Sequence, residues 1–209
     1  MTLLEVLVVI VVVVIQMAVL FPKLFGVGRS KKPRLVNCIN NLKQVGLAYR
    51  HWEGDNGDIF PMGISVTKGG SMEMVATGDV VQTFLVMSNE LDMPKLLHCP
   101  DDFAITEARS FAGLAGSNIS YFVGVDITND MNPRMIVSGD DNFEIGGVPI
   151  KSGLLQLGSN NPVAWTVARH QQHTGNLGLA DGSVQSVTTA GLRNCLQQTC
   201  LATNRLAIP

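Results

Sequence analysis

The sequence lacks the features that usually identify enzymes and nucleic-acid-binding proteins. Only 15% of its residues are charged and its net charge is −2, so no basic surface for nucleic acid is indicated. Neither G-x-x-x-x-G-K nor G-x-G-x-x-G occurs, which argues against glycine-rich phosphate binding. The four cysteines form no C-x-x-C pair, so neither a zinc module nor attached haem is indicated. We therefore expect a protein that is not an enzyme and that has no cofactor and no nucleic-acid partner.

What the sequence does contain is a long apolar run at its start, from Met1 to Phe21. As a helix that rises about 1.5 Å per residue, this run would span roughly 31 Å, close to the hydrocarbon thickness of a bilayer. No lysine or arginine precedes it, and it is too long for the apolar part of a signal peptide. Its one ionisable side chain is Glu5, and a carboxylate in apolar surroundings is costly unless a positive group neutralises it. The α-amine of Met1, from the same or a neighbouring subunit, is the nearest such group.

Residues Met1 to Ile10 resemble the mature N-terminus of type IV pilins and type II secretion pseudopilins. Chains of these families begin with Phe or Met, carry Glu at the fifth position and continue as an apolar helix. The resemblance implies that a basic leader ending in glycine is removed and that the Met1 amine is then N-methylated. It also implies that Glu5 pairs with the Met1 amine of an adjacent subunit in the core of a filament.

The apolar run is followed by residues that weaken helices: Pro22, Gly26, Gly28 and Pro33. Proline removes a backbone donor, and glycine lowers helix stability by roughly 1 kcal/mol relative to alanine. Type IV pilins carry a proline where Pro22 stands, and the resemblance makes it an assembly residue together with Met1 and Glu5. We therefore expect a stem helix and hinge over residues 1–33 that is kinked or melted between 22 and 33.

Residues 34–209 are expected to form one globular head of the type IV pilin-like α+β fold, with an antiparallel sheet. Apolar residues at three- and four-residue steps predict a helix from about Arg34 to Glu53, the second half of the long N-terminal helix. The acidic segment after it lacks a complete calcium-binding loop, so a plain turn is expected there, with a calcium site as the alternative. The other expected elements are a surface loop with a short strand at 62–80, a buried helix at 80–91, strands at 95–102, 117–126 and 133–142, a hairpin at 177–187, a helix near 190–202 and an extended end.

Three segments of the head are similar to a large family of bacterial pseudopilins. These segments are CINNLKQVGLAYRHWEGDNGDIFP (38–61), LHCPDD (97–102) and WTVARHQQHTGNLGLADGSVQSV (165–187). In that family a histidine precedes an Asp-Gly pair by nine intervening residues. Here ten residues separate His170 from Asp181 and seven separate His173 from Asp181, so it stays open which histidine corresponds.

These motif residues are expected to have a structural role. The pair Asp181-Gly182 between two apolar runs predicts a hairpin turn in which the carboxylate accepts backbone hydrogen bonds. A nearby imidazole, from His170 or His173, would brace the loop. Zinc would need a third or fourth ligand, and none lies at a recognisable spacing, so no metal site is expected.

The even number of cysteines is consistent with two disulfides in an exported protein, with three connectivities open. We expect Cys38 to pair with Cys99, because the first lies on the apolar side of the helix and the second ends a segment that should pack against it. Cys195 would then pair with Cys200, provided that the helix breaks between them. Four reduced, buried thiols are the alternative.

These observations predict a major pilin-like subunit that polymerises with itself into an extracellular, cell-surface filament through its N-terminal helix. Before assembly it is expected in the inner membrane, where the prepilin peptidase and the pilus or secretion assembly machinery would act on it. Two alternatives remain open. The chain would otherwise be a pseudopilin of a type II secretion machine, or a minor binding subunit at a filament tip.

Overall fold

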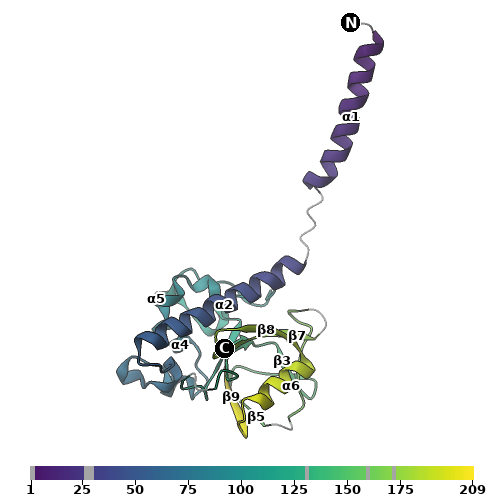
Figure 1. The fold of residues 1–209 in the computed structure, drawn as a ribbon. Coiled ribbons are helices and arrows are strands. Elements are labelled where there is room, and N and C mark those ends of the chain that lie inside the picture. Colours follow the sequence, from purple (N-terminus) through teal and green to yellow (C-terminus); the bar gives the residue numbers. More distant parts are fainter. Residues whose placement is uncertain (1–2, 26–30, 130–131, 159–160, 171–172) are drawn as a thin grey trace. The chain divides into compact units, whose positions relative to one another are not determined.

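The computed structural model describes residues 3–25, 31–129, 132–158, 161–170 and 173–209, and the chain divides into two compact units, Met1–Arg34 and Leu35–Pro209 (Figure 1). The first unit holds helix α1 (Leu3–Phe25). Among the described residues, none of the helices has the length and apolar character that crossing a membrane requires.

Helix α1 does not break at Pro22, where a kink or a melted segment was predicted to begin, but continues to Phe25. Proline in a helix removes one hydrogen bond, and the turns on either side can remain helical. Pro33 lies in the first turn of α2 (Lys31–Asp55), where a missing N–H costs no intrahelical bond. The remainder of the predicted break, with Gly26 and Gly28, lies outside the described residues.

The second unit is an α+β structure in which α2 packs on a six-stranded sheet, and this confirms the α+β class. The further helices are α3 (Met72–Val75), α4 (Val81–Val86), α5 (Ser88–Leu91) and α6 (Thr189–Gln198), with 3-10 turns η1 (Pro61–Gly63), η2 (Val66–Lys68), η3 (Pro94–Leu97), η4 (Phe111–Gly113) and η5 (Gly116–Asn118). The strands are β1 (Tyr121–Gly124), β2 (Ile136–Asp140), β3 (Phe143–Ile145), β4 (Val148–Pro149), β5 (Gly153–Gly158), β6 (Val163–Trp165), β7 (Thr174–Leu179), β8 (Val184–Thr188) and β9 (Thr203–Ile208).

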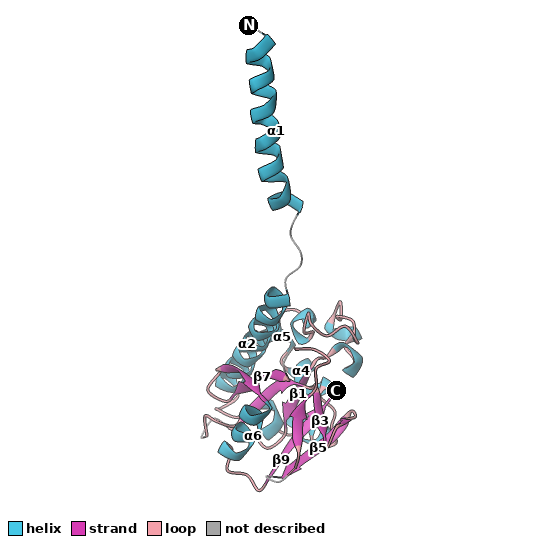
Figure 2. Cartoon of the chain, turned by 90° about the vertical axis from the view of Figure 1, so that its right-hand side faces the viewer, coloured by secondary structure: helices cyan, strands magenta, loops and turns pink. Residues whose placement is uncertain are grey.

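The main sheet has the order β5-β9-β1-β2-β7-β8, and all of its pairings are antiparallel. A smaller sheet, β4-β3-β6, is formed mostly by the segment between β2 and β7 (Figure 2). Successive side chains of a strand point to opposite faces. Accordingly Tyr121 and Val123 of β1 join the core cluster under α2, whereas Phe122 joins a second cluster with α6 and the smaller sheet.

Helix α2 buries one stripe against the sheet, as its apolar spacing predicted. The stripe consists of Cys38, Leu42, Val45, Ala48, Tyr49 and Trp52, all of them buried. The helix ends in a plain turn, in which the amides of Asn56 and Asp58 both donate to the carbonyl of Glu53. The predicted hairpin is also confirmed, since β7 and β8 pair around Gly182, whose φ of 81° suits glycine.

Two sequence-based predictions about the segment between α2 and β1 are wrong. Residues 62–80 were expected to be a loop with a strand, and they form 3-10 turns and the short helix α3 instead. Residues 95–102 were expected to be a strand, but η3 and an irregular segment occupy them. Pro94 starts η3 and Pro100 has no N–H to give to a ladder, so this segment is unsuited to a sheet.

Candidate functional site

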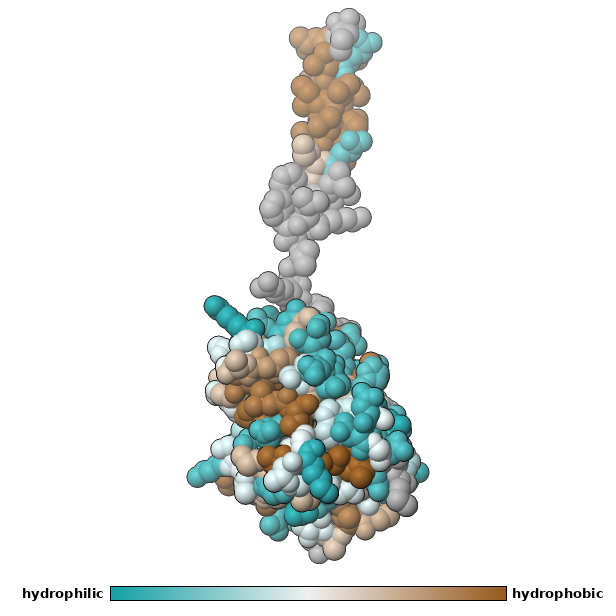
Figure 3. Space-filling model, turned by 90° about the vertical axis from the view of Figure 1, so that its left-hand side faces the viewer, coloured by the Kyte–Doolittle hydropathy of each residue, from teal (hydrophilic) through white to brown (hydrophobic). Residues whose placement is uncertain are grey.

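Two regions of the described structure have features that a stable fold alone does not require: the apolar helix α1 and a buried polar cluster in the second unit. In α1 every residue from Leu3 to Met17 is exposed, including 85% of Leu3 and 60% of Val14. Figure 3 shows this apolar surface in brown along α1. Glu5 lies in the first turn of α1. Met1 is outside the described residues, so the predicted pairing of its amine with Glu5 stays a prediction.

A disulfide joins Cys38 of α2 to Cys99, and this confirms the first predicted pair. Both cysteines are fully buried. The backbone N–H of Cys99 donates to Ser120 Oγ at 2.9 Å, and the Tyr121 hydroxyl donates to the carbonyl of Cys38 at 3.4 Å. The bridge therefore fastens α2 both to the irregular segment after η3 and to the start of β1.

The second predicted pair, Cys195 with Cys200, is wrong, because α6 continues for three residues past Cys195 before it ends and both cysteines are free. Helix α6 continues to Gln198, so Cys195 remains on its inner face among apolar side chains. Cys200 lies beyond the helix end and is exposed. Both thiols are free, and burial raises the pKa of Cys195.

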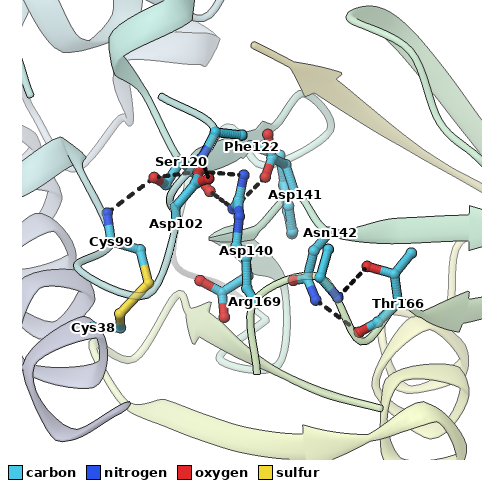
Figure 4. Close-up of polar contacts among 12 residues, drawn as sticks. Cys38, Cys99, Asp102, Ser120, Phe122, Asp140, Asp141, Asn142, Thr166 and Arg169 are labelled. Carbon is cyan, nitrogen blue, oxygen red and sulfur yellow. Dashed lines mark hydrogen bonds and ion pairs between the residues drawn. A yellow bond between two sulfur atoms is a disulfide. The ribbon is translucent and has the colours of Figure 1, made fainter. Parts of the chain in front are cut away.

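The centre of the polar cluster is Arg169, whose guanidinium is almost buried between two carboxylates (Figure 4). It lies 2.6 Å from Asp102 Oδ2, pairs closely with Asp141 and donates to the carbonyl of Ser120 at 2.7 Å. Ser120 Oγ donates in turn to Asp102 Oδ2 at 2.9 Å. Burial raises the pKa of Asp141 to about 6, and the charge of Arg169 acts in the opposite direction. The cluster thus joins the segment after η3, the end of β2 and the segment after β6.

His170 lies beside this ion pair and is also buried, with carboxylates at both of its nitrogens. Nε2 is 3.0 Å from Asp140 Oδ2, and Nδ1 is 3.3 Å from Asp101 Oδ2. Burial lowers the pKa of His170, but the hydrogen bond and charge of Asp140, with the charge of Asp101, raise it above its usual value. The Asn176 side-chain amide and the Cys99 sulfur also face Nε2, at 3.2 and 3.9 Å.

The cluster contains buried oxygens that have no hydrogen-bond partner among the described residues: Asp140 Oδ1, Asn142 Oδ1 and Asn176 Oδ1. Asp140 Oδ2, in contrast, accepts from both the backbone and the side-chain N–H groups of Asn176, at 2.7 and 2.9 Å. Buried acceptors without a donor are uncommon because their desolvation is not compensated. The cluster can therefore accept a further donor or cation, which is what a binding site offers.

A cavity of about 450 Å³ borders the cluster. Its wall includes Asp102, Asp141, Asn142 and Arg169 from the polar side, and Phe103, which is 72% exposed. The wall also includes apolar side chains, among them Phe143, Pro149 and Ile150, so a small polar ligand held by the charged groups would contact apolar surface as well.

The predicted motif residues His170, His173 and Asp181 do not lie together in the structure. Asp181 lies in the exposed β7–β8 turn and accepts from the backbone N–H of Ser183 at 2.8 Å, which confirms its expected role. His173 is exposed, and its Nδ1 lies 2.9 Å from the carbonyl of Trp165. His170, however, contacts Asn176 near the start of β7, far along the strand from the turn. The imidazole that is buried in the polar cluster therefore does not brace this turn.

The carboxylates of the cluster were not predicted. A signal was present, because the chain contains two Asp-Asp pairs, 101–102 and 140–141, each close to a short apolar segment. Their convergence with Arg169 depends on tertiary contacts between segments far apart in the chain. No protein-family model, curated protein or solved structure matches this chain. Arguments about its function therefore rest on the sequence motifs and on the geometry described above.

Proposed function

We propose that this chain is a structural subunit of a pilin-like filament, in which copies of α1 pack together and the second unit forms the outer surface. The observation that carries the proposal is the apolar surface of α1. Its exposed side chains include the four consecutive residues Leu7, Val8, Val9 and Ile10, which follow one another at steps of about 100° around the axis and therefore lie on all sides of the helix. A helix that is apolar all round requires cover on every side.

A bundle of identical helices would supply that cover, whereas one docked partner would cover a single face. The free energy gained when this surface is buried can be estimated from the ten residues from Val6 to Ile15. All of them are Val, Leu or Ile, and each is 42–60% exposed. Burying such side chains fully stabilises by about 1.5–3 kcal/mol each, so roughly half of that per residue gives on the order of 10 kcal/mol per subunit. Contacts that repeat from one subunit to the next without closing generate an open filament.

Glu5 would set the register of this packing. It is the one acidic residue in the sequence of α1 and lies in its first turn. In the core of a filament, a carboxylate requires a positive partner such as the terminal amine of a neighbouring subunit, and any other register would leave the charge uncompensated. Processing by a prepilin peptidase and residence in the inner membrane before assembly belong to the same proposal.

The second unit is suited to be a rigid outer domain. Its helix α2 is fixed to the sheet by an apolar stripe and by the Cys38–Cys99 disulfide. Val36 and Leu47 of α2 remain more than half exposed, so part of this helix is available for contacts with neighbouring subunits. The cavity beside Arg169 favours a second candidate function, a minor subunit that binds a small polar ligand at a filament tip.

Electron microscopy of fibres sheared from cells that produce the full chain would test the proposal. We expect long filaments that contain this protein, and we expect Glu5→Ala to reduce their number strongly while the protein level stays the same. Gln16→Ala is the matched control, because it removes the other polar group of the apolar run and should leave filaments intact. Confinement of the protein to one end of the fibres would favour the tip alternative, and its absence from all fibres would favour the secretion alternative. A normal filament yield from Glu5→Ala would contradict the proposed role of that residue.

A further inference from the structure

The disulfide and His170 bring together three side chains that are common zinc ligands. The sulfurs of Cys38 and Cys99 and a ring nitrogen of His170 all lie within 4.8 Å of one another, and all three residues are buried. Sulfur of Cys99 and Nε2 of His170 are 3.9 Å apart. Zinc binds thiolate sulfur at about 2.3 Å and imidazole nitrogen at about 2.0 Å, so two such ligands in a tetrahedral site are about 3.5 Å apart. The atoms therefore need to move only a little to share an ion.

Asp140 would supply the fourth donor. Its Oδ2 is 3.0 Å from Nε2 of His170, so the carboxylate lies beside the nitrogen that would bind the ion, and the two atoms would separate to the spacing of about 3.4 Å that such ligands have around zinc. The side chain is fully buried, and its Oδ1 has no hydrogen-bond partner among the described residues. This unpartnered oxygen is independent of the cysteines and indicates a position where a cation would be stabilised.

The other side of the imidazole faces a second carboxylate. A ligating histidine normally donates its second ring N–H to a carboxylate, which fixes the ring and the tautomer. Nδ1 of His170 lies 3.3 Å from Asp101 Oδ2 but makes no hydrogen bond among the described residues, so this bond would form when the ion binds. Asp101 would thus be a positioning residue rather than a ligand.

We propose that Cys38, Cys99, His170 and Asp140 form a zinc site when the disulfide is reduced. A dithiol reductant would cleave the sulfur–sulfur bond: its two thiols become a disulfide, and the two cysteines each gain one hydrogen. Zinc then displaces the two thiol protons, and Nε2 binds the ion as a neutral imidazole. Two thiolates and an imidazole are ligands that zinc prefers over magnesium or calcium.

The chain would then have two mutually exclusive states at the same place. In the oxidised state the sulfurs bind each other, and in the reduced state they bind the ion. Both states connect α2 to the segment after η3 through the two cysteines, and the zinc state would add His170 to this link. Zinc would therefore stabilise the head before the disulfide forms, and it would slow oxidation of the two cysteines. This inference does not depend on the proposed filament function.

Cobalt provides a direct test, since tetrahedral Co²⁺ with thiolate ligands has strong visible bands and a near-ultraviolet charge-transfer band. The test uses the full chain in detergent, with Cys195→Ser and Cys200→Ser in all samples so that no other thiols are present. The protein is reduced with a dithiol, which is removed under anaerobic conditions before Co²⁺ is added. We expect one Co²⁺ per reduced chain, loss of the bands when Zn²⁺ is added, and no thiolate bands from the oxidised chain.

Variants then identify the ligands. His170→Gln should abolish or greatly weaken the cobalt bands, whereas His173→Gln, the matched control, should retain them. Asp101→Asn keeps all four ligands and should weaken affinity about 10- to 100-fold with little change in the spectrum. The proposal is overturned if the reduced chain gives no thiolate–cobalt band, or if His170→Gln binds as tightly as His173→Gln. A reduced chain that is unfolded and does not regain its circular dichroism spectrum with Zn²⁺ would also overturn it.

Discussion

Replacement of Arg169 by methionine should destabilise the protein strongly, and more at alkaline than at acidic pH. Methionine retains much of the side-chain volume but removes the positive charge and all of the N–H donors. The carboxylates of Asp102 and Asp141 would then lose their shared partner, with only 3% and 14% of their side chains exposed. The carbonyl of Ser120 would lose the donor that lies 2.7 Å away.

The magnitude follows from the burial of these groups. Breaking a buried ion pair by removing one partner costs about 3–5 kcal/mol, because an uncompensated charge stays inside the protein. The cost depends on pH because Asp141, with a pKa already raised to about 6, can accept a proton instead. Arg169 lowers that pKa in the wild type, so its removal should raise the pKa of Asp141 further. The destabilisation should therefore be smaller at pH 5 than at pH 8.

Urea unfolding of the oxidised chain in detergent, followed by tryptophan fluorescence at both pH values, would measure this effect. Arg205→Met is the matched control, because Arg205 also pairs with a carboxylate, Asp126, but its own side chain is 44% exposed. An exposed pair contributes about 0–1 kcal/mol, so the control should lose little at either pH. Equal losses in the two variants, or a larger loss for Arg169→Met at pH 5, would refute the reasoning.

Three further perturbations test other parts of the second unit by the same unfolding measurement. Replacing Cys38 and Cys99 together by alanine should cost about 4 kcal/mol, the loop-closure entropy of a bridge between residues 61 positions apart, and a loss below 1 kcal/mol would contradict this. Asp141 has a folded pKa of about 6, above its ordinary value of 3.8, so the folded state binds the proton more tightly and stability should fall as pH rises between these values. The change should be about 1.4 kcal/mol per pH unit, and Asp141→Asn should lack it. Gly175→Ala would place a Cβ 2.5 Å from the buried ring of Trp165, which should cost about 1–3 kcal/mol and alter the near-ultraviolet circular dichroism.

The parts of the fold that the sequence predicts correctly are those determined by short-range patterns. The apolar stripe of α2 follows the helical period, and the β7–β8 hairpin follows from its Asp-Gly turn. The Cys38–Cys99 bridge joins residues 61 positions apart, and its prediction is confirmed although the strand expected to end at Cys99 is absent. In these cases local preference and tertiary packing agree.

The wrong predictions concern a segment whose apolar residues show no clear period and a cysteine pair whose formation depended on where a helix ends. Residues 95–102 contain Leu96 and Leu97, which are buried in a 3-10 turn rather than in a strand. Cys195 and Cys200 were paired on the assumption of a helix break, but α6 gains more by keeping Leu192, Cys195 and Leu196 together against the second core cluster.

The polar cluster could not be predicted, because no short segment contains it. Its charges come from the segment after η3, the end of β2 and the segment after β6, and only the fold brings them together. Each of its residues taken alone resembles an ordinary polar loop residue. The two Asp-Asp pairs were visible in the sequence, but their burial was not.

The position of the cluster indicates what it contributes to the fold. The chain between η3 and β1 forms no strand ladder among its described residues, so its backbone groups need other partners. Two are supplied at one place, where Ser120 Oγ accepts from the Cys99 N–H and Arg169 donates to the Ser120 carbonyl. The Cys38–Cys99 bridge and the ion pair of Asp102 with Arg169 add side-chain links there. A buried ion pair adds little net stability over a well-packed apolar core, but it strongly disfavours arrangements in which a charge is left unpaired. We infer that the cluster fixes the position of this irregular segment against α2 and the sheet, and that its loss would loosen α2 before it unfolded the sheet.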